Sequence, residues 1–200
     1  MDGVYQLTFT GRATARMLFR WERLSRLLEE HGQFLNSHDM SVFPENLQDS
    51  IDMLGDCMVI QNNMLDINAT YREIVEKLSM PSSLKGISPI FDAHFTEVVV
   101  SIALRNAPTS IILTRDIYEI VAEKYEDALR AFLSCENARL YVVDEARLAL
   151  AVTDSFLALS LFKDGGFDAQ TNLMSFEESA LKWGEELFEY YKQGARKIKP

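Results

Sequence analysis

Cysteine and histidine are scarce in this 200-residue sequence, which has two cysteines and three histidines. Cys57 and Cys135 lie far apart and form no Cys-x-x-Cys pair, so we expect two buried free thiols. His31, His38 and His94 have no partner at metal-ligand spacing, and none belongs to a His-Glu-x-x-His motif. The sequence therefore predicts neither a metal site nor a cofactor.

Long apolar segments are also missing. No run of apolar residues approaches the roughly 20 needed to cross a membrane, and the first residues lack the pattern of a secretory signal peptide. We therefore expect a cytoplasmic chain with no membrane partner. The phosphate-binding P-loop, the dinucleotide motif Gly-x-Gly-x-x-Gly and the nucleophile elbow Gly-x-Ser-x-Gly are absent as well. Their absence argues against those three classes of enzyme.

Basic residues are fewer than acidic ones, 20 against 30, and the net charge is −10. The acidic excess lies in residues 31–191, which carry 11 basic and 26 acidic side chains and hence a net charge of −15. Residues 1–30 hold five arginines against four acids, and the last nine residues hold four basic side chains and no acid. Because the acidic body repels phosphate, only the two ends are candidates for contact with DNA.

The first segment, residues 1–11, alternates in strand-forming residues over Val4–Thr8, which predicts a strand that Gly11 ends. The run Tyr5-Gln6-Leu7-Thr8-Phe9-Thr10-Gly11 resembles the end of a winged-helix DNA-binding domain, where the last wing strand leads into a linker helix. This resemblance implies that residues 1–11 are the remnant of a wing. It also implies that the DNA-reading helix lies outside this chain, upstream of Met1.

Residues 12–35 are expected to form a long linker helix. Met17, Trp21, Leu24 and Leu28 follow one another at spacings of four, three and four residues, the pattern of a coiled-coil seam over about two heptads. An amphipathic helix packed on its own domain would show a similar stripe. The sequence thus leaves two interpretations open, a homodimer seam and an intramolecular face.

Residues 36–200 show the rhythm of an α/β domain with a mixed sheet and flanking helices. Strand–helix–strand units predict parallel pairing with right-handed crossovers, and the short link Asp154-Ser155 predicts a hairpin. Asp92 and Thr114 are expected to cap helices, and Ser175–Glu178 resembles a capping box. The expected strands are 57–60, 86–91, 110–114, 139–143, 148–153 and 156–162; the expected helices are 71–78, 92–102, 114–133 and one from 175 onward.

Polar side chains at the ends of these strands form the candidate ligand site. Ligands of open α/β sheets bind beyond the carboxyl ends of the strands, where we expect Ser88, Thr114, Asp144 and Asp154, with Arg147 close by. Asp144 and Asp154 are expected to end adjacent strands and to converge on one crevice. The alternatives are structural: Asp154 as a turn former, and Ser88 and Thr114 as helix caps or partners of the local backbone.

Five stretches in the second half of the chain occur in an order that resembles one family. They are Gly86-Ile87-Ser88-Pro89-Ile90-Phe91, Ile111-Ile112-Leu113-Thr114, Leu140-Tyr141-Val142-Val143-Asp144-Glu145, Ala149-Leu150-Ala151-Val152-Thr153-Asp154 and Trp183-Gly184-Glu185-Glu186-Leu187-Phe188-Glu189-Tyr190-Tyr191. They resemble the effector domain of archaeal winged-helix transcription regulators of the methanogenesis-regulatory-protein type. The resemblance covers residues 86–198, and its most specific part is Trp183-Gly184-Glu185-Glu186.

This family's effector domain is similar to the half-sandwich of the phospholipase D fold, whose catalysis depends on a His-x-Lys pair. In this sequence His31, His38 and His94 are followed two residues later by Gln, Met and Thr. The resemblance therefore implies a phospholipase-D-like fold without phosphodiesterase chemistry.

Together these observations predict the regulatory part of a helix-turn-helix transcription regulator and not an enzyme. We expect it to bind a small effector of unknown identity, to form a homodimer, and to reach DNA through a winged helix that is mostly absent from this chain. Two alternatives stay open. One is an enzyme with an acidic site around Asp144 and Asp154, and the other is a dimerisation module with no ligand.

Overall fold

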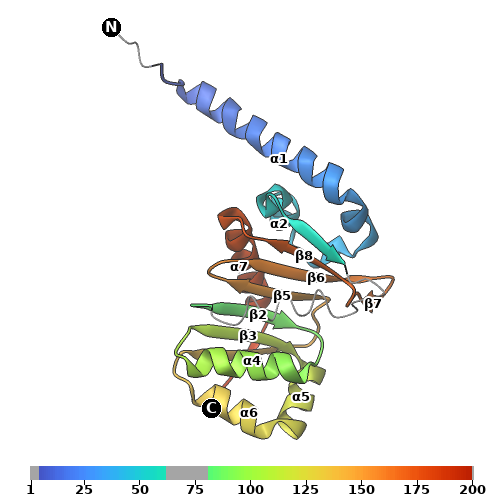
Figure 1. Ribbon diagram of the computed structural model, residues 1–200, viewed down its shortest axis with the longest axis vertical. Helices are drawn as coiled ribbons and strands as arrows, with labels where there is room; N and C mark the ends of the chain where they lie inside the picture. Colours follow the sequence, from blue (N-terminus) through green and yellow to red (C-terminus); the bar gives the residue numbers. More distant parts are fainter. Residues whose placement is uncertain (1–4, 62–80, 200) are drawn as a thin grey trace.

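A single long helix opens the computed structural model, which describes residues 5–61 and 81–199. Helix α1 spans Phe9–Ser37, 29 residues or about 43 Å at 1.5 Å per residue. It projects from one end of the α/β body (Figure 1). The Thr8 hydroxyl caps the helix by accepting a hydrogen bond from the Gly11 amide at 3.1 Å.

The strand predicted to end at Thr8 is not present in the described residues 5–8, which have no regular secondary structure. Gly11 does not end a strand either, because it lies in the first turn of α1. Strand pairing needs a neighbouring strand, and within residues 5–61 and 81–199 none lies beside this segment. The helix therefore runs through the expected boundary between residues 11 and 12.

A nine-stranded mixed sheet forms the centre of the described body, in the order β1-β8-β6-β5-β2-β3-β4-β9, with β7 beside β6. Strands β2, β3 and β4 are parallel, which confirms the predicted strand–helix–strand pairing. Strands β5 and β6 form the predicted antiparallel hairpin. The strands are β1 Met58–Gln61, β2 Leu84–Ser88, β3 Thr109–Thr114, β4 Ala138–Val143, β5 Leu148–Thr153, β6 Leu157–Lys163, β7 Gly166–Phe167, β8 Thr171–Ser175 and β9 Arg196–Ile198.

Helices and short helical turns cover both faces of the sheet. One face carries the end of α1, the short elements that follow it, and α7; the other carries α4 and α6. After α1 the helical elements are η1 Met40–Val42, α2 Glu45–Gln48, η2 Ile51–Leu54, α4 Ala93–Leu104, α5 Arg115–Lys124, α6 Glu126–Ser134 and α7 Glu178–Gln193. The helix predicted over 71–78 lies outside the described residues.

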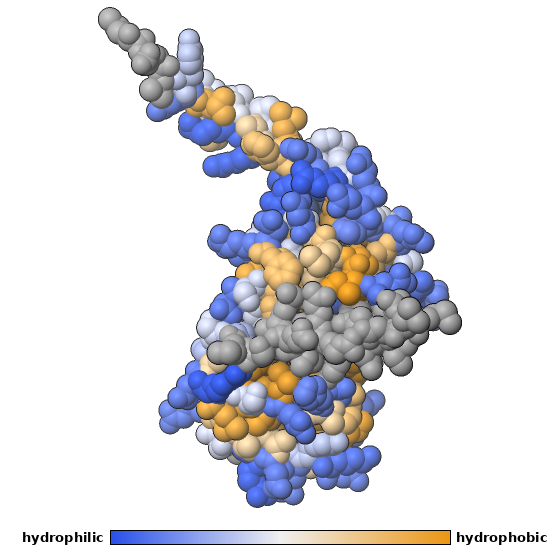
Figure 2. Space-filling model, viewed as in Figure 1, coloured by the Kyte–Doolittle hydropathy of each residue, from blue (hydrophilic) through white to orange (hydrophobic). Residues whose placement is uncertain are grey.

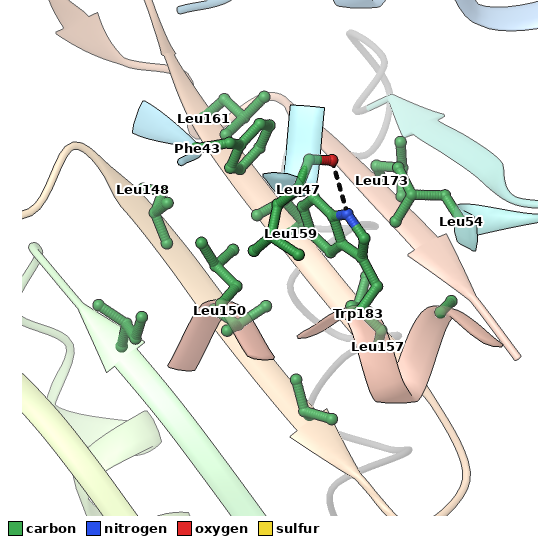
Figure 3. Close-up of a cluster of buried hydrophobic side chains, with 14 of the residues drawn as sticks. Phe43, Leu47, Leu54, Leu148, Leu150, Leu157, Leu159, Leu161, Leu173 and Trp183 are labelled. Carbon is green, nitrogen blue, oxygen red and sulfur yellow. Dashed lines mark hydrogen bonds between the residues drawn. The ribbon is translucent and has the colours of Figure 1, made fainter. Parts of the chain in front are cut away.

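The larger apolar core lies between α7, α2 and the sheet. Trp183 of α7 is fully buried at its centre and donates from Nε1 to the Leu47 carbonyl oxygen at 3.0 Å (Figure 3). The Phe43 ring meets the indole edge-on, with ring centroids 5.0 Å apart. Leu157 and Leu159 of β6 complete the packing from the sheet. The Trp-containing run thus ties the C-terminal helix to the short elements that follow α1.

Gly184 allows α7 to lie unusually close to the sheet. A Cβ atom on this residue would stand 2.4 Å from Leu157 Cδ1 and 2.7 Å from Val152 Cγ2, inside van der Waals contact. Any larger side chain would force the helix away from β5 and β6. Close packing therefore gives a physical reason for the glycine in the Trp183-Gly184 pair.

Two predicted helix boundaries differ from the structure. The helix predicted over 114–133 divides at Tyr125 into α5 and α6, because the Tyr125 backbone is not helical (φ −133°, ψ 38°). The capping box predicted at Ser175 is wrong, since Glu177 is the N-cap residue of α7 and makes no side-chain cap. Ser175 instead lies in β8, where its hydroxyl donates to the Leu54 carbonyl oxygen at 2.7 Å.

Candidate functional site

Three arginines at spacings of three residues hold α1 on the body. Arg20 bonds the Asp52 carboxylate, with 2.9 Å between its terminal nitrogen and Oδ1 and 3.3 Å between Nε and Oδ2. Arg23 donates to the Ser179 hydroxyl at the start of α7 at 2.7 Å, and Arg26 pairs with Asp56 at 2.8 Å. The row therefore connects the helix to η2, to the loop that follows η2 and to the start of α7.

The electrostatics of this row centre on Asp52, whose side chain is only 5% exposed. Hydrogen bonding to Asp52, with its charge, raises the pKa of Arg20. Arg20 also donates to the Asp49 carbonyl oxygen at 3.0 Å, so one guanidinium bonds both the end of α2 and η2. This row was not predicted from the sequence. The available signal was the pair of carboxylates Asp52 and Asp56, which match Arg20 and Arg26.

Beside the arginines, the predicted coiled-coil seam faces solvent along much of its length. Met17 is 74% exposed, Trp21 68% and Leu28 51%, whereas Leu24 is half-buried. Leu27, Phe34 and Leu35, in the second half of the same helix, are buried in the core. Figure 2 shows apolar surface along the projecting helix. Three of the four stripe residues are therefore exposed in this structure, and the homodimer seam stays a prediction.

The C-terminal end of α1 is fixed by His38, which is buried. Its Nε2 lies 3.1 Å from Asp168 Oδ2, and its Nδ1 lies 2.8 Å from the Phe34 carbonyl oxygen. Both ring nitrogens thus have oxygen partners, which hold the ring between the end of α1 and the loop that carries Asp168. Burial raises the pKa of Asp168, but the Gln170 amide, the Thr171 hydroxyl and His38 outweigh it, so the pKa lies below its ordinary value.

The residues of the predicted ligand site have mostly local partners. Ser88, at the end of β2, donates to the Ile90 carbonyl oxygen at 2.7 Å. Thr114 ends β3 and is the N-cap residue of α5, but its side chain makes no capping bond. Asp144 follows β4, is 84% exposed, and pairs with Arg115. These three residues lie at the same edge of the sheet because their strands are parallel.

Arg147 precedes β5 and pairs with Asp39 at 2.9 Å. Its guanidinium carbon lies 5.7 Å from the centroid of the Phe162 ring. A hydrogen bond from the Ser41 side chain and the positive charge of Arg147 hold the pKa of Asp39 below its ordinary value, although burial opposes them. In this structure Arg147 therefore ties the start of β5 to the loop that follows α1.

Asp154 lies at the opposite edge of the sheet, so the prediction that it converges with Asp144 is wrong. Thr153 at the end of β5 pairs with Leu84 at the start of β2, because the two strands are antiparallel. Strands β2 and β3 separate β4 from β5. Asp154 accepts a hydrogen bond from the Ser82 amide at 3.0 Å. The acidic enzyme site that was the alternative function has no geometric support.

We next consider metal binding and thiol reactivity in the part of the chain that the structure describes. No three His, Cys, Asp or Glu side chains are placed there to hold a metal ion. Burial raises the pKa of Cys57 to about 12, so this thiol stays protonated and inert at neutral pH. Cys135 is also free, but it is half-buried, whereas a buried thiol was expected. Among the described helices none is both long and apolar enough to cross a bilayer.

The family described as "Methanogenesis regulatory protein FilR1, middle domain" matches residues 67–194, well over half of the chain. The chain belongs to this family. The resemblance seen in the five ordered stretches is thereby confirmed. A curated relative, the methanogenesis regulatory protein FilR1 of Methanothrix harundinacea (strain 6Ac), is 29% identical over 202 residues. The match covers 97% of this chain but 45% of the relative, so this chain spans less than half of that protein's length.

Solved structures with a similar arrangement include TrmBL2, an archaeal chromatin protein whose structure shows a novel mode of DNA binding. It has a TM-score of 0.55 and 14% identity, with 94% of this chain and 66% of that chain covered. Phosphatidylserine synthase of Haemophilus influenzae has a TM-score of 0.51 and 11% identity, with 72% and 39% covered. At these identities the likeness shows the fold alone. The expected phospholipase-D-like α/β fold is confirmed.

Proposed function

We propose that this chain is the effector-binding and dimerisation part of a transcription regulator, and that it has no catalytic activity. The observation that carries the proposal is the exposed Met17, Trp21 and Leu28 stripe on a helix whose other side is fixed to the body. Most of the stability of a helix in a protein comes from packing of its apolar face, and the spacing of this stripe is that of a coiled-coil seam formed with a second copy.

Parallel pairing of two copies would place the two N-terminal ends of α1 side by side. A DNA-binding head attached to each would then be held at a fixed separation, as paired half-sites on DNA require. The relative's name links the family to regulation, and more than half of that protein lies outside the match, which leaves room for a winged helix. The DNA contact of the TrmBL2 neighbour is consistent with this proposal. We place the regulator in the cytoplasm.

Sedimentation equilibrium of the parent chain and of two charged variants tests the dimer. Trp21→Glu puts a carboxylate on the seam. Phe19→Glu is the control, because Phe19 is 65% exposed and Trp21 68%. Phe19 lies about 200° around the helix from Met17 and is therefore off the seam. We expect the parent and Phe19→Glu to dimerise at micromolar concentration and Trp21→Glu to be monomeric. A monomeric parent, or equal weakening by both variants, would exclude the seam.

The third function considered from the sequence, a dimerisation module with no ligand, makes the same prediction for sedimentation. Saturable binding of a small molecule to the body separates the two. The candidate place for that binding is a cavity between the sheet and helices α4, α5 and α6.

A further inference from the structure

A cavity of about 60 Å³ lies between the sheet and the helices on its second face. Helices α4, α5 and α6 lie together at the β3–β4 end of the sheet (Figure 1), and residues of all three helices line the cavity. Its walls are mostly hydrocarbon, with Val99, Ile111 and Phe132 buried and Leu113 and Leu129 half-buried. Protein interiors contain few voids larger than a water molecule, and water needs several polar partners to occupy one. The walls therefore favour an apolar occupant.

One end of the cavity is polar. The Ser88 hydroxyl donates to the Ile90 carbonyl oxygen at 2.7 Å, and the Thr96 hydroxyl donates to the Asp92 carbonyl oxygen at 2.9 Å. Each hydroxyl donates its one proton in this way and can still accept a hydrogen bond. The Asp92 carboxylate caps α4 by accepting from the Phe95 amide at 2.6 Å. This end therefore suits a ligand that donates a hydrogen bond and disfavours an anion.

An aromatic pair stands beside the cavity. The Phe91 ring, which lines it, lies 4.9 Å from the Tyr125 ring at an angle of 40°. Tyr125 is the residue at which the helix predicted over 114–133 divides into α5 and α6. The break between α5 and α6 therefore lies beside Phe91, close to the end of β2 that carries Ser88.

We propose that this cavity binds a small uncharged molecule with a short hydrocarbon part and one hydrogen-bond donor, of the class of a short-chain alcohol. A dry cavity of about 150 Å³ holds benzene, so the enclosed part here takes roughly two to four heavy atoms and the rest of a ligand lies at the mouth. In naming this cavity as the effector site the inference rests on the proposed function; binding itself does not depend on dimerisation.

Methyl NMR of the full chain with 1-butanol as the probe tests the site. We expect saturable shifts of the Ile111, Leu113 and Leu129 methyl groups, and a Kd at least tenfold lower than for butyrate, which has the same chain length and a negative charge. Asp92→Asn keeps a good helix cap but removes the charge, so it should narrow the difference between the two probes. Ala128→Leu fills the cavity and should abolish the shifts.

Shifts that do not saturate, that persist in Ala128→Leu, or that appear equally at the exposed Leu104 would overturn the proposal. If Ala128→Leu fails to fold, Ile117→Phe fills the same space from α5 and gives the same test. Sedimentation in the presence of 1-butanol keeps the two proposals separate. If the chain binds 1-butanol but stays monomeric, only the dimer proposal is contradicted. If the chain dimerises but does not bind 1-butanol, only the proposal for this cavity is contradicted.

Discussion

The guanidinium of Arg20 bonds both oxygens of Asp52, at 2.9 and 3.3 Å, and this pair fixes the projecting helix to η2. Only one partner of the pair is buried. Asp52 is 5% exposed and Arg20 60%. Loss of the arginine therefore leaves a buried carboxylate without its main partner, whereas loss of the carboxylate leaves an arginine that water can solvate.

Replacing Arg20 should cost more stability than replacing a neighbouring arginine. We expect Arg20→Ala to lower the free energy of unfolding by about 1–2 kcal/mol. Arg16→Ala is the matched control: Arg16 is exposed one turn earlier on the same helix, so its replacement should change stability by less than about 0.5 kcal/mol. Urea unfolding at neutral pH measures both. Equal effects would mean that the Arg20 pair does not anchor the helix.

Two of the helical glycines, Gly184 and Gly32, should respond to alanine in opposite directions. Gly184→Ala places a methyl group 2.4 Å from Leu157 Cδ1, and we expect a loss of about 1–3 kcal/mol from overpacking. Gly32→Ala meets no atom within 4 Å, and the better helix propensity of alanine should add about 0.5–1 kcal/mol. Thermal unfolding of both variants is the measurement. A stabilised Gly184→Ala would contradict the close helix–sheet packing.

Asp154 should stabilise the folded chain at neutral pH and not in acid. Hydrogen bonding from Ser82 lowers the pKa of Asp154, although burial opposes it. Because the folded pKa lies below the unfolded value of about 3.9, the stabilisation is present above that value and is lost as pH falls through the folded pKa.

Asp154→Asn should therefore lower the melting temperature at pH 7, and the difference from the parent should shrink below about pH 4. Such a result supports the turn-forming role that was one of the two alternatives for this residue. An unchanged melting temperature at pH 7 would show that Asp154 does not hold the Ser82 loop.

DNA binding by this chain alone should be weak and without sequence preference. The −15 charge of residues 31–191 opposes contact with phosphate, and only the arginines of α1 and the basic C-terminal residues favour it. We expect binding to duplex DNA to disappear between low salt and about 0.15 M salt. Nanomolar, sequence-selective binding at physiological salt would place a DNA-reading surface within this chain.

The sequence predicted the parts of the fold that follow from local periodicity. The β2-β3-β4 parallel unit and the β5–β6 hairpin came from apolar runs and turn residues, and both are confirmed. Strands β8 and β9 were not predicted. Thr171–Ser175 and Arg196–Ile198 are short, and each becomes a strand because an existing edge pairs with it. Such pairing depends on distant partners, which local patterns do not show.

The candidate ligand residues were harder to place than the strands that carry them. Asp144 and Asp154 follow successive sheet strands in the chain, but strand direction and order put them at opposite edges. The ligand roles of Ser88, Thr114, Asp144, Arg147 and Asp154 remain predictions. Of these residues only Ser88 lines the apolar cavity. The cavity itself could not be predicted, because it depends on how three helices pack over one face of the sheet.

Cysteine cross-linking along α1 tests the central claim, that two copies pair in parallel through the seam. Trp21→Cys and Phe19→Cys, each in a Cys135→Ser background, place a single thiol on and off the seam; the buried Cys57 stays unreactive at neutral pH. After mild oxidation we predict a disulfide-linked dimer from Trp21→Cys and a monomer from Phe19→Cys on a non-reducing gel. Equal cross-linking of the two variants, or none in either, would contradict the account.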